Sequence, residues 1–285
     1  SMSVAQNPLE LAPADPLDDP GLEPDRVHYA TGTLLGAEDF LAEQAYHRGR
    51  LGRALGALFG HGSIAGLRVT LIPATPERAE QLMVEPGLAL DRLGRLIELP
   101  RALCIDLDRW LAALPADTRT GALHPKDPAD TLAGLVVDVF VRYLPCARGK
   151  TPAAATGPFD ALDYTVPSRI RDGCAVDLVP RAETLPPLPH NVWPELDAIA
   201  DPATRAAAFR DAALDAWPEP QFDVNGRRRL APLAEHVLGQ DPATLWLARV
   251  QIPAAGDPPA RAPGDVAIDN SARAFVPAHA RWIGL

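Results

Sequence analysis

The sequence has few cysteines, no long apolar run and no secretory signal. Its three cysteines, Cys104, Cys146 and Cys174, are widely spaced, which excludes a disulfide framework and any Cys-x-x-Cys metal site. Whether Cys146 pairs with Cys174 across a loop stays open at this level. No window reaches the roughly 18 apolar residues of a membrane span, and no basic segment followed by an apolar core opens the chain. We therefore expect synthesis in the cytoplasm and no membrane span.

Positive charge is also scarce. The 285 residues include 27 lysines and arginines against 37 aspartates and glutamates, a formal net charge of −10. Proteins that bind a phosphate backbone normally present a basic face, and the run Arg227-Arg228-Arg229 is too short to supply one. The composition therefore predicts that nucleic acid is not the partner.

Catalytic motifs are missing as well. The chain has no P-loop, no GxGxxG that opens a helix and no HExxH. The stretch Gly62–Gly66 reads GSIAG, but it follows a predicted helix instead of preceding one, so it does not match the strand-to-helix turn of a hydrolase nucleophile. We therefore predict a protein that is not an enzyme, with no catalytic residue, no cofactor and no metal.

One alternative is a metal-dependent hydrolase centred on Glu43 and His47. These residues are spaced i and i+4, and Asp39 precedes them by another four, so all three can share a helix face. His28 and His61 flank the same helix, and carboxylates with histidines can bind a divalent metal. A solvated helix face accounts for the same residues without a metal.

A second alternative is a module that recognises carbohydrate. Tryptophans can form a platform on which sugars stack, although scattered tryptophans are usually core or interface anchors. Paired carboxylates could in addition cleave a glycosidic bond, although acidic residues at strand ends and turns are common. The tryptophans are Trp110, Trp193, Trp217, Trp246 and Trp282, and the carboxylates are Asp91, Asp106, Asp138 and Asp177.

The 31 prolines favour extended segments and turns over long helices. Residues 1–27 are rich in Pro, Asp and Glu with few large apolar groups, and we predict an extended arm that is solvated or lies along a partner. Residues 28–285 are predicted to form a single globular domain. From about residue 180 to 240 the patterns turn helical, over 202–217 and 230–238, which predicts a helical insertion near 194–240.

The most patterned stretch is Tyr29–Val69, and it predicts a helix from about Ala37 to Phe59. Apolar residues recur at spacings of three and four, acidic residues occupy the first half and arginines the second, which suits the helix dipole. Gly49, Gly52 and Gly56 weaken a helix but let another backbone approach closely, so we expect this helix to pack on a sheet. The apolar residues of the stripe are Phe40, Leu41, Tyr46, Leu51, Ala54, Leu55 and Leu58.

Most of the remaining chain reads as strands. The strongest pattern is 133–144, an apolar run typical of a central strand, and 145–167 is rich in Pro, Gly and Ala and predicts a loop. The fold class expected is α+β, with a mainly antiparallel sheet, a long N-terminal helix packed on it and the helical insertion. The other predicted strands are 64–72, a hairpin over 81–100, 104–107, 169–179, 245–252, 266–269 and 273–276.

Tyr29–Val69 resembles the opening of a family of largely uncharacterised bacterial proteins encoded among genes for contractile, phage-tail-like particles. Further matches follow in the family's order over residues 29–276. In two places the chain departs from the pattern: His61 stands where an aromatic is usual, and Phe59 replaces a usual histidine. The matching segments are Tyr29, Gly32, Leu34-Leu35, Ala37, Asp39-Phe40, Glu43-Gln44, Tyr46, Arg50, Gly60, Gly62, Gly66-Leu67, Val69, 85–91, Gly94-Arg95, Ile97, 141–143, 168–173, 247–250 and Ile268-Asp269-Asn270-Ser271 with Arg273.

The resemblance implies a structural or accessory protein of a phage-tail-like contractile injection assembly, such as an adaptor or a baseplate- or fibre-associated piece. Its partners would be other protein subunits of that assembly, with a homo-oligomer left open, and it would end up in a released or cell-associated particle or only help to build it. We expect the contacts to be made by residues 3–27, 145–167 and 194–240, the least core-like segments.

Overall fold

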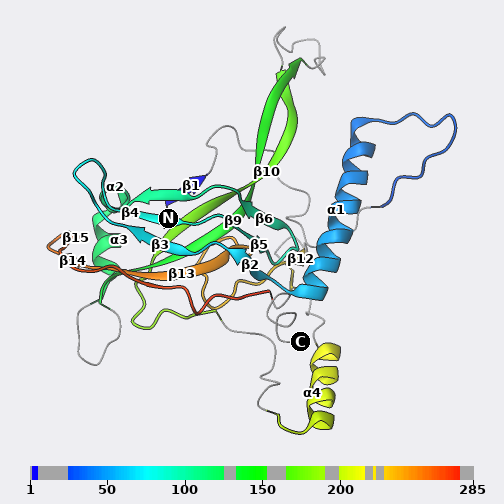
Figure 1. The fold of residues 1–285 in the computed structure, drawn as a ribbon. Helices are drawn as coiled ribbons and strands as arrows, with labels where there is room; N and C mark the ends of the chain where they lie inside the picture. Colours follow the sequence, from blue (N-terminus) through cyan, green and yellow to red (C-terminus); the bar gives the residue numbers. More distant parts are fainter. Residues whose placement is uncertain are drawn as a thin grey trace.

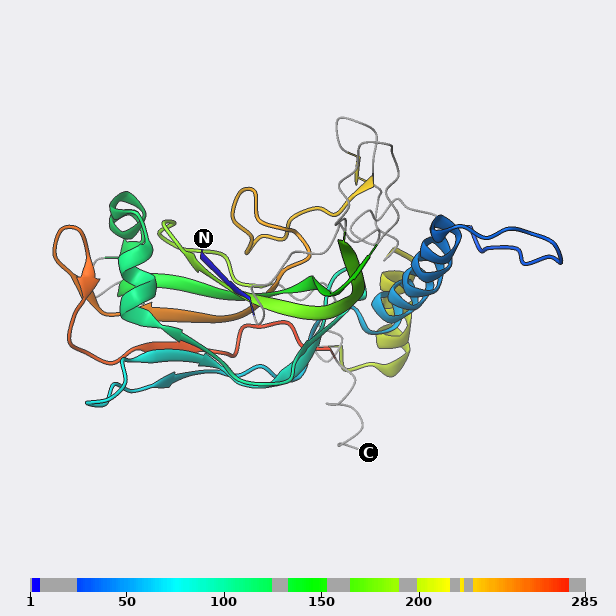
Figure 2. The same cartoon turned by 90° about the horizontal axis from the view of Figure 1, so that it is seen from above.

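The computed structural model describes residues 2–5, 25–124, 133–152, 165–189, 199–215, 221–222 and 228–276. Within these residues the fold is α+β, and every strand pairing is antiparallel apart from one isolated bridge. Two β layers stack face to face, and helices lie at their ends (Figures 1 and 2). The predicted fold class is therefore confirmed.

One layer is a six-stranded sheet in the order β1-β10-β9-β13-β16, with β8 also paired to β9. The central strand β9 begins at Gly134, as its apolar pattern predicts, and β1 shows that the start of the predicted arm pairs with the edge of β10. The rest of the arm, residues 6–24, lies outside the described residues. The strands are β1 Met2–Ala5, β8 Leu123–His124, β9 Gly134–Pro152, β10 Thr165–Pro180, β13 Leu245–Ile252 and β16 Ala267–Asp269.

The second layer is a three-stranded meander that bends across its middle into two small sheets, β2-β5-β6 and β3-β4-β7. The register continues through the bend, because Gly66 faces Gly87 and Val69 faces Val84 with the same offset. The single predicted strand 64–72 is therefore wrong, and the predicted hairpin 81–100 is divided in the same way. The strands are β2 Gly62–Gly66, β3 Val69–Ile72, β4 Gln81–Val84, β5 Gly87–Leu90, β6 Leu96–Leu99 and β7 Leu103–Asp106.

The bend depends on glycine and on an unusual backbone angle. Gly66 and Leu67 both have positive φ, 66° and 55°, which turns the chain from one small sheet into the other. A Cβ on Gly87 would meet the backbone of Leu67 and Ala65. Only glycine therefore fits where the two strands cross at the bend.

The segment after β16 holds the bend from outside. The side-chain amide of Asn270 accepts a hydrogen bond from the Val69 amide at 2.9 Å and donates one to the Val69 carbonyl at 3.0 Å. The Arg273 guanidinium donates to the Leu67 carbonyl at 2.8 Å. These side chains satisfy backbone groups that the break in the sheet would leave unpaired.

The main core fills the space between the two layers. It takes side chains from alternate positions of β9, β10 and β13 on one side and from the meander on the other, and Trp110 closes one end. Trp110 lies on α2 (Leu107–Ala113), which Asp106 caps by accepting a hydrogen bond from the Arg109 amide. The short helix α3 (Ala116–Gly121) follows. The two layers and the helices at their end are clear in Figure 2.

The other face of the six-stranded sheet carries a smaller cluster of Phe140, Val179 and Trp246. Val237 and Ala272 pack against it. The predicted helix over 230–238 is wrong, since these residues form turns in which the ring of His236 lies 5.9 Å from that of Phe140. A buried segment without regular secondary structure needs side chains that form hydrogen bonds with its backbone. The 3.6-residue spacing of apolar residues, on which the helix prediction rested, does not reveal such side chains.

The helical insertion is confirmed in part by α4 (Pro202–Asp215). Residues 194–198, 216–220 and 223–227 of the insertion lie outside the described residues. The remaining small elements are β11 Gln221–Phe222 with β12 Arg228–Arg229, and β14 Ala254–Ala255 with β15 Ala260–Arg261.

The predicted loop 145–167 is strand at both of its described ends, 145–152 and 165–167. β9 continues to Pro152 and β10 begins at Thr165, and the two pair from Val137 and Pro180 out to these ends. Their far ends leave the sandwich as a two-stranded ribbon, residues 145–152 and 165–172, which projects above the body in Figure 1. Residues 153–164 lie outside the described part of the chain.

The helix α1 has the predicted bounds, Ala37–Phe59, but not the predicted packing. It stands at one end of the sandwich, and only Ala45 and Gly52 on it are buried (Figure 1). Gly52 is the glycine that allows a close approach, since a Cβ there would lie 2.8 Å from the Leu93 carbonyl, whereas one on Gly56 would meet nothing within 4 Å. The apolar stripe therefore does not cover the sheet.

Candidate interaction site

The residues of the proposed metal site have other partners. Nε2 of His47 lies 2.8 Å from Oε1 of Glu43, whose second oxygen accepts a hydrogen bond from the Val27 amide. Asp39 accepts from the Gly36 amide and so caps the start of α1. Among the described residues, no group of three His, Cys, Asp or Glu side chains is placed to bind a metal. Of the predicted cluster, Glu43 and His47 are in direct contact.

The tryptophans that the structure describes are buried. Trp110 lies in the main core and Trp246 in the smaller cluster, at 1% and 3% exposure, so neither can stack on a sugar. The sugar platform is therefore wrong for these two residues. Trp193, Trp217 and Trp282 lie outside the described residues.

The four carboxylates considered for glycoside cleavage each have a structural partner. Asp106 caps α2, and Asp177 pairs with Arg142 across β9 and β10 at 3.0 Å. Asp91 is fully buried in the turn between β5 and β6, where it accepts from the amides of Leu93 and Arg95 and from the Arg95 guanidinium at 2.6 Å. Burial raises the pKa of Asp91, against the opposing effect of Arg95. These carboxylates hold turns and strands.

Asp138 is the centre of a buried charge cluster on the outer face of the six-stranded sheet. Both of its oxygens accept from Arg249, at 2.8 and 2.9 Å, and Arg181 approaches one of them to 3.4 Å. The arginines also donate to the carbonyls of Pro186 and Glu235, so the cluster ties two irregular segments to the sheet. Removing one member of such a buried cluster would leave an uncompensated buried charge and would strongly destabilise the fold.

The two candidate cysteines do not form a disulfide, and Cys104 is not in a disulfide either. In the register of β9 and β10, Cys174 faces Tyr143 and Cys146 faces Arg171. Burial raises the pKa of Cys174 to about 11, which keeps it as the unreactive thiol.

A polar network joins α1 to the sandwich at Tyr143. The Tyr143 hydroxyl donates to Asp172 at 2.5 Å and accepts from Arg48 of α1 at 3.3 Å. The Arg95 guanidinium lies over the Tyr143 ring, 4.6 Å from its centre. The network positions the helix against the turn 91–95 and the base of the ribbon.

His61, directly after α1, lies at the same junction. Burial, with Arg92 and His236 nearby, lowers the pKa of His61 to about 4. His236 accepts the Leu233 amide at Nδ1 and donates from Nε2 to the Thr244 carbonyl, and burial lowers its pKa too. Arg92 donates to the carbonyls of Ala231 and Pro242. The hydrogen bonds of His236 and Arg92 therefore hold the segment 231–244 in place.

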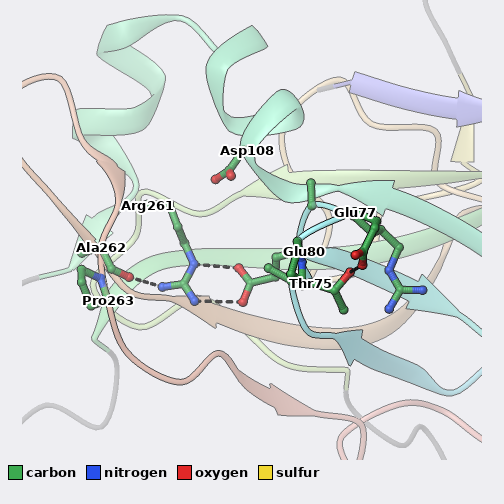
Figure 3. Close-up of a pocket in the computed structure, with 11 residues that line it drawn as sticks. Thr75, Glu77, Glu80, Asp108, Arg261, Ala262 and Pro263 are labelled. Carbon is green, nitrogen blue, oxygen red and sulfur yellow. Dashed lines mark hydrogen bonds and ion pairs between the residues drawn. The ribbon is translucent and has the colours of Figure 1, made fainter.

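An open hollow of about 600 Å³ lies at the opposite end of the molecule from α1. It is lined by the β3–β4 turn, Asp108 and residues 261–263 (Figure 3). The Arg261 guanidinium spans its floor and donates to both oxygens of Glu80, at 2.8 and 3.1 Å, so the Glu80 carboxylate raises the pKa of Arg261. The central cation of the hollow is thus already neutralised, and its role is to join two loops.

The ribbon carries the most unusual exposed charge. Arg148 faces Arg169 directly across the two strands, and Arg171 is two positions further along the same face. All three arginines are exposed. Like charges directly opposite one another destabilise an antiparallel pair. This arginine face is therefore the strongest candidate for an interaction site on the ribbon. Of its three arginines only Arg148 lies in the contact segment predicted from the sequence, 145–167, and the pairing was not predicted.

No family model matches the chain, and no curated protein matches it either. None of the described helices is both long enough and apolar enough to cross a membrane.

Proposed function

We propose that this protein is a structural or accessory component of a phage-tail-like contractile assembly and acts through protein–protein contacts. The observation that carries the proposal is the ribbon, which projects from an otherwise acidic protein with three arginines on one face. Exposed arginines that repel one another across the two strands are explained by a partner outside the chain.

The residues that carry the family resemblance support a framework role. Gly66 and Gly87 form the bend, Asp91 with Arg95 forms a turn, and Asn270 latches the bend. These motifs build a scaffold instead of gathering at one reactive point. A scaffold that presents a ribbon and a helix suits a subunit of an assembly.

The ribbon face predicts an acidic surface on the partner. Exposed arginines attract carboxylates over about 10 Å at moderate ionic strength, so they direct association and make it sensitive to salt. We expect the partner to be another subunit of the assembly, docked on Arg148, Arg169 and Arg171.

The first test asks whether the protein belongs to a particle. In a strain that carries the gene beside sheath, tube and baseplate genes, deleting it should reduce the number of complete particles seen by electron microscopy. Particles that form normally without the protein, together with its absence from purified particles and from pull-downs of their subunits, would refute the proposal.

The second test addresses the ribbon directly. Replacing Arg148, Arg169 and Arg171 by glutamate should weaken capture of the partner subunit by about tenfold or more, because favourable charge pairs become repulsive. The matched control reverses three exposed arginines of the body, Arg68, Arg101 and Arg109, and should leave capture unchanged. An equal loss in both variants would show that net charge alone matters. If the glutamate variant kept its binding to the partner subunit and instead lost binding to RNA, the ribbon would be assigned to a nucleic-acid partner.

A further inference from the structure

One edge of the ribbon is open along the strand that carries Arg169 and Arg171. On one side β10 pairs with β9 from Thr165 to Pro180, and on the other side β1 pairs with Ala175–Leu178 alone. No other described strand pairs with this outer edge, and residues 167–172 are all exposed. The pairing of β1 shows that the edge of β10 accepts an extended segment.

The hydrogen-bond pattern fixes which residues of β10 direct their backbone groups outward. The Arg181 amide donates to the Val136 carbonyl at 2.8 Å, and the register between β9 and β10 runs without a shift from there into the ribbon. Because consecutive residues of a strand direct their backbone groups to opposite sides, Ser168, Ile170 and Asp172 present theirs to the outer edge. An added strand would therefore pair with these three residues.

The opposite edge of the ribbon, on β9, does not suit a further strand. By the same alternation, Pro145 and Gly149 are among the residues that direct backbone groups to that edge. Proline has no N–H to donate, and Gly149 has a positive φ of 66°, which interrupts the extended backbone. The edge of β10 is therefore the one that a regular strand can extend.

The side chains along this edge alternate between charged and apolar. Arg169 and Arg171 point to one face of the ribbon, and Ile170, which is 55% exposed, points to the other face together with Asp172. An added antiparallel strand places one residue beside each of these side chains, and the residues beside the two arginines form the closer, non-hydrogen-bonded pairs. Carboxylates fit beside the arginines and an apolar side chain fits beside Ile170, whereas Asp172 disfavours an acid on that second face.

The arm of this chain does not have the matching pattern. In the register of β1 with β10, position 8 would face Asp172, and positions 9 and 11 would face Arg171 and Arg169. The sequence has proline at position 8, which cannot donate a hydrogen bond, and leucine at positions 9 and 11. The arm is therefore not the matched occupant of this edge.

We propose that the outer edge of β10 binds an extended segment of a partner protein as an added strand. The segment carries acidic residues at alternate positions, beside Arg169 and Arg171, and an apolar residue between them, beside Ile170. Backbone hydrogen bonds supply affinity and the alternation supplies specificity, while Arg148, one strand further away, acts at longer range. The inference rests on the proposed function only for the identity of the partner, because a synthetic peptide can test the edge without any assembly component.

Two blocked peptides of identical composition test the alternation. Thr-Val-Glu-Val-Glu-Val-Thr can place both glutamates beside the arginines, whereas Thr-Val-Val-Glu-Glu-Val-Thr cannot in any register, because neighbouring side chains point to opposite faces. Fluorescence anisotropy of the labelled peptides with the full chain should show about tenfold tighter binding of the first. The double variant Arg169→Gln, Arg171→Gln should remove this preference, and the matched control Arg148→Gln should keep it.

The variant Ile170→Pro tests the backbone pairing. It removes the outward N–H and leaves the ladder with β9 intact, so binding of the alternating peptide should weaken about tenfold or more. The matched control Ile170→Thr keeps the N–H and should weaken binding by about threefold or less. An N-methyl group on the central valine of the peptide removes the facing donor without changing the protein, and should weaken binding as much as Ile170→Pro does.

Unchanged circular dichroism shows that the variants are folded. No binding of the alternating peptide, equal binding of the two peptides, full binding of the N-methylated peptide, or equal losses in the two Ile170 variants would each overturn the proposal. Failure of the particle tests with these peptide results intact would overturn only the assignment to a tail-like assembly.

Discussion

The sandwich body and the helix α1 both carry apolar side chains at regular spacings, with opposite results. In the body, Val137 and Val139 of β9 and Leu247 of β13 contribute to the main core and are completely or almost completely buried. On α1, Phe40 and Leu58 repeat with equal regularity and are exposed. The apolar faces of the body are buried within one chain, because the two sheets cover each other. The helix α1, in contrast, approaches the body on the side that carries Gly52 and leaves its apolar stripe exposed.

The difference shows what a hydrophobic pattern can and cannot predict. Periodicity identifies the element and its apolar side, because both follow from backbone geometry. It does not say whether that side faces the same chain or another one. Exposure in the folded chain supplies the missing information, and on α1 it points outward.

The largest effect is expected in the body, at Asp138. Replacing Asp138 by alanine leaves the buried Arg249 without its carboxylate and Arg181 with Glu183 alone, which should reduce the free energy of unfolding by about 3–5 kcal/mol. Urea unfolding followed by circular dichroism measures this loss. The control is Asp177→Ala, whose partner Arg142 is partly exposed and can be hydrated, so the loss should be much smaller. Equal losses in the two variants would show that burial does not increase the contribution of the Asp138 cluster to the free energy of unfolding.

An intermediate effect is expected at the junction of helix and body, where His61 lies near Arg92 and His236. The pKa of His61 in the folded state is about 4, below its usual 6.5. The unfolded chain therefore binds more protons between these values, and stability present above pH 6.5 is lost as the pH falls towards 4. Allowing for partial exposure, we expect about 1–2 kcal/mol.

Unfolding in urea across that pH range measures the slope. The His61→Gln variant, which cannot take up this proton, should show a shallower slope than the natural chain. A slope that stays the same would mean that His61 does not titrate in this window, and the pH dependence would then belong to His236, which Glu235 and Asp241 also face.

Much of the fold could be predicted from residue patterns. The bounds of α1, the central strand from Gly134, the strand 245–252 and the turn at Asp91 all follow from local rules of periodicity and turn chemistry. The bend at Gly66 and Leu67 could not, because it depends on Asn270 and Arg273, which lie about 200 residues away in the chain. Tertiary contacts of this kind leave no local signal.

The candidate site was predicted less well, for a related reason. A composition rich in Pro, Gly and Ala suggested a loop over 145–167, yet long cross-strand pairing extends both strands into it. The opposition of Arg148 and Arg169 depends on the register, which the sequence of either strand alone does not specify. Each of the four candidate carboxylates forms hydrogen bonds or an ion pair with a structural partner. These partners lie either in the same turn or far away in the sequence, and the sequence pattern does not show them.

The smallest effect is expected on α1 and compares two of its glycines, Gly52 at the contact with the body and Gly56 away from it. Gly56→Ala should stabilise the helix by about 1 kcal/mol, because alanine favours the helical backbone and a Cβ there meets no neighbour. Gly52→Ala has the same intrinsic gain, but its Cβ would lie 2.8 Å from the Leu93 carbonyl and would push α1 off the turn. Hydrogen exchange of the α1 amides should therefore slow in the first variant and quicken in the second. If both variants slowed exchange equally, the contact between α1 and the body would contribute nothing, and the helix would be held only by Arg48 and Tyr143.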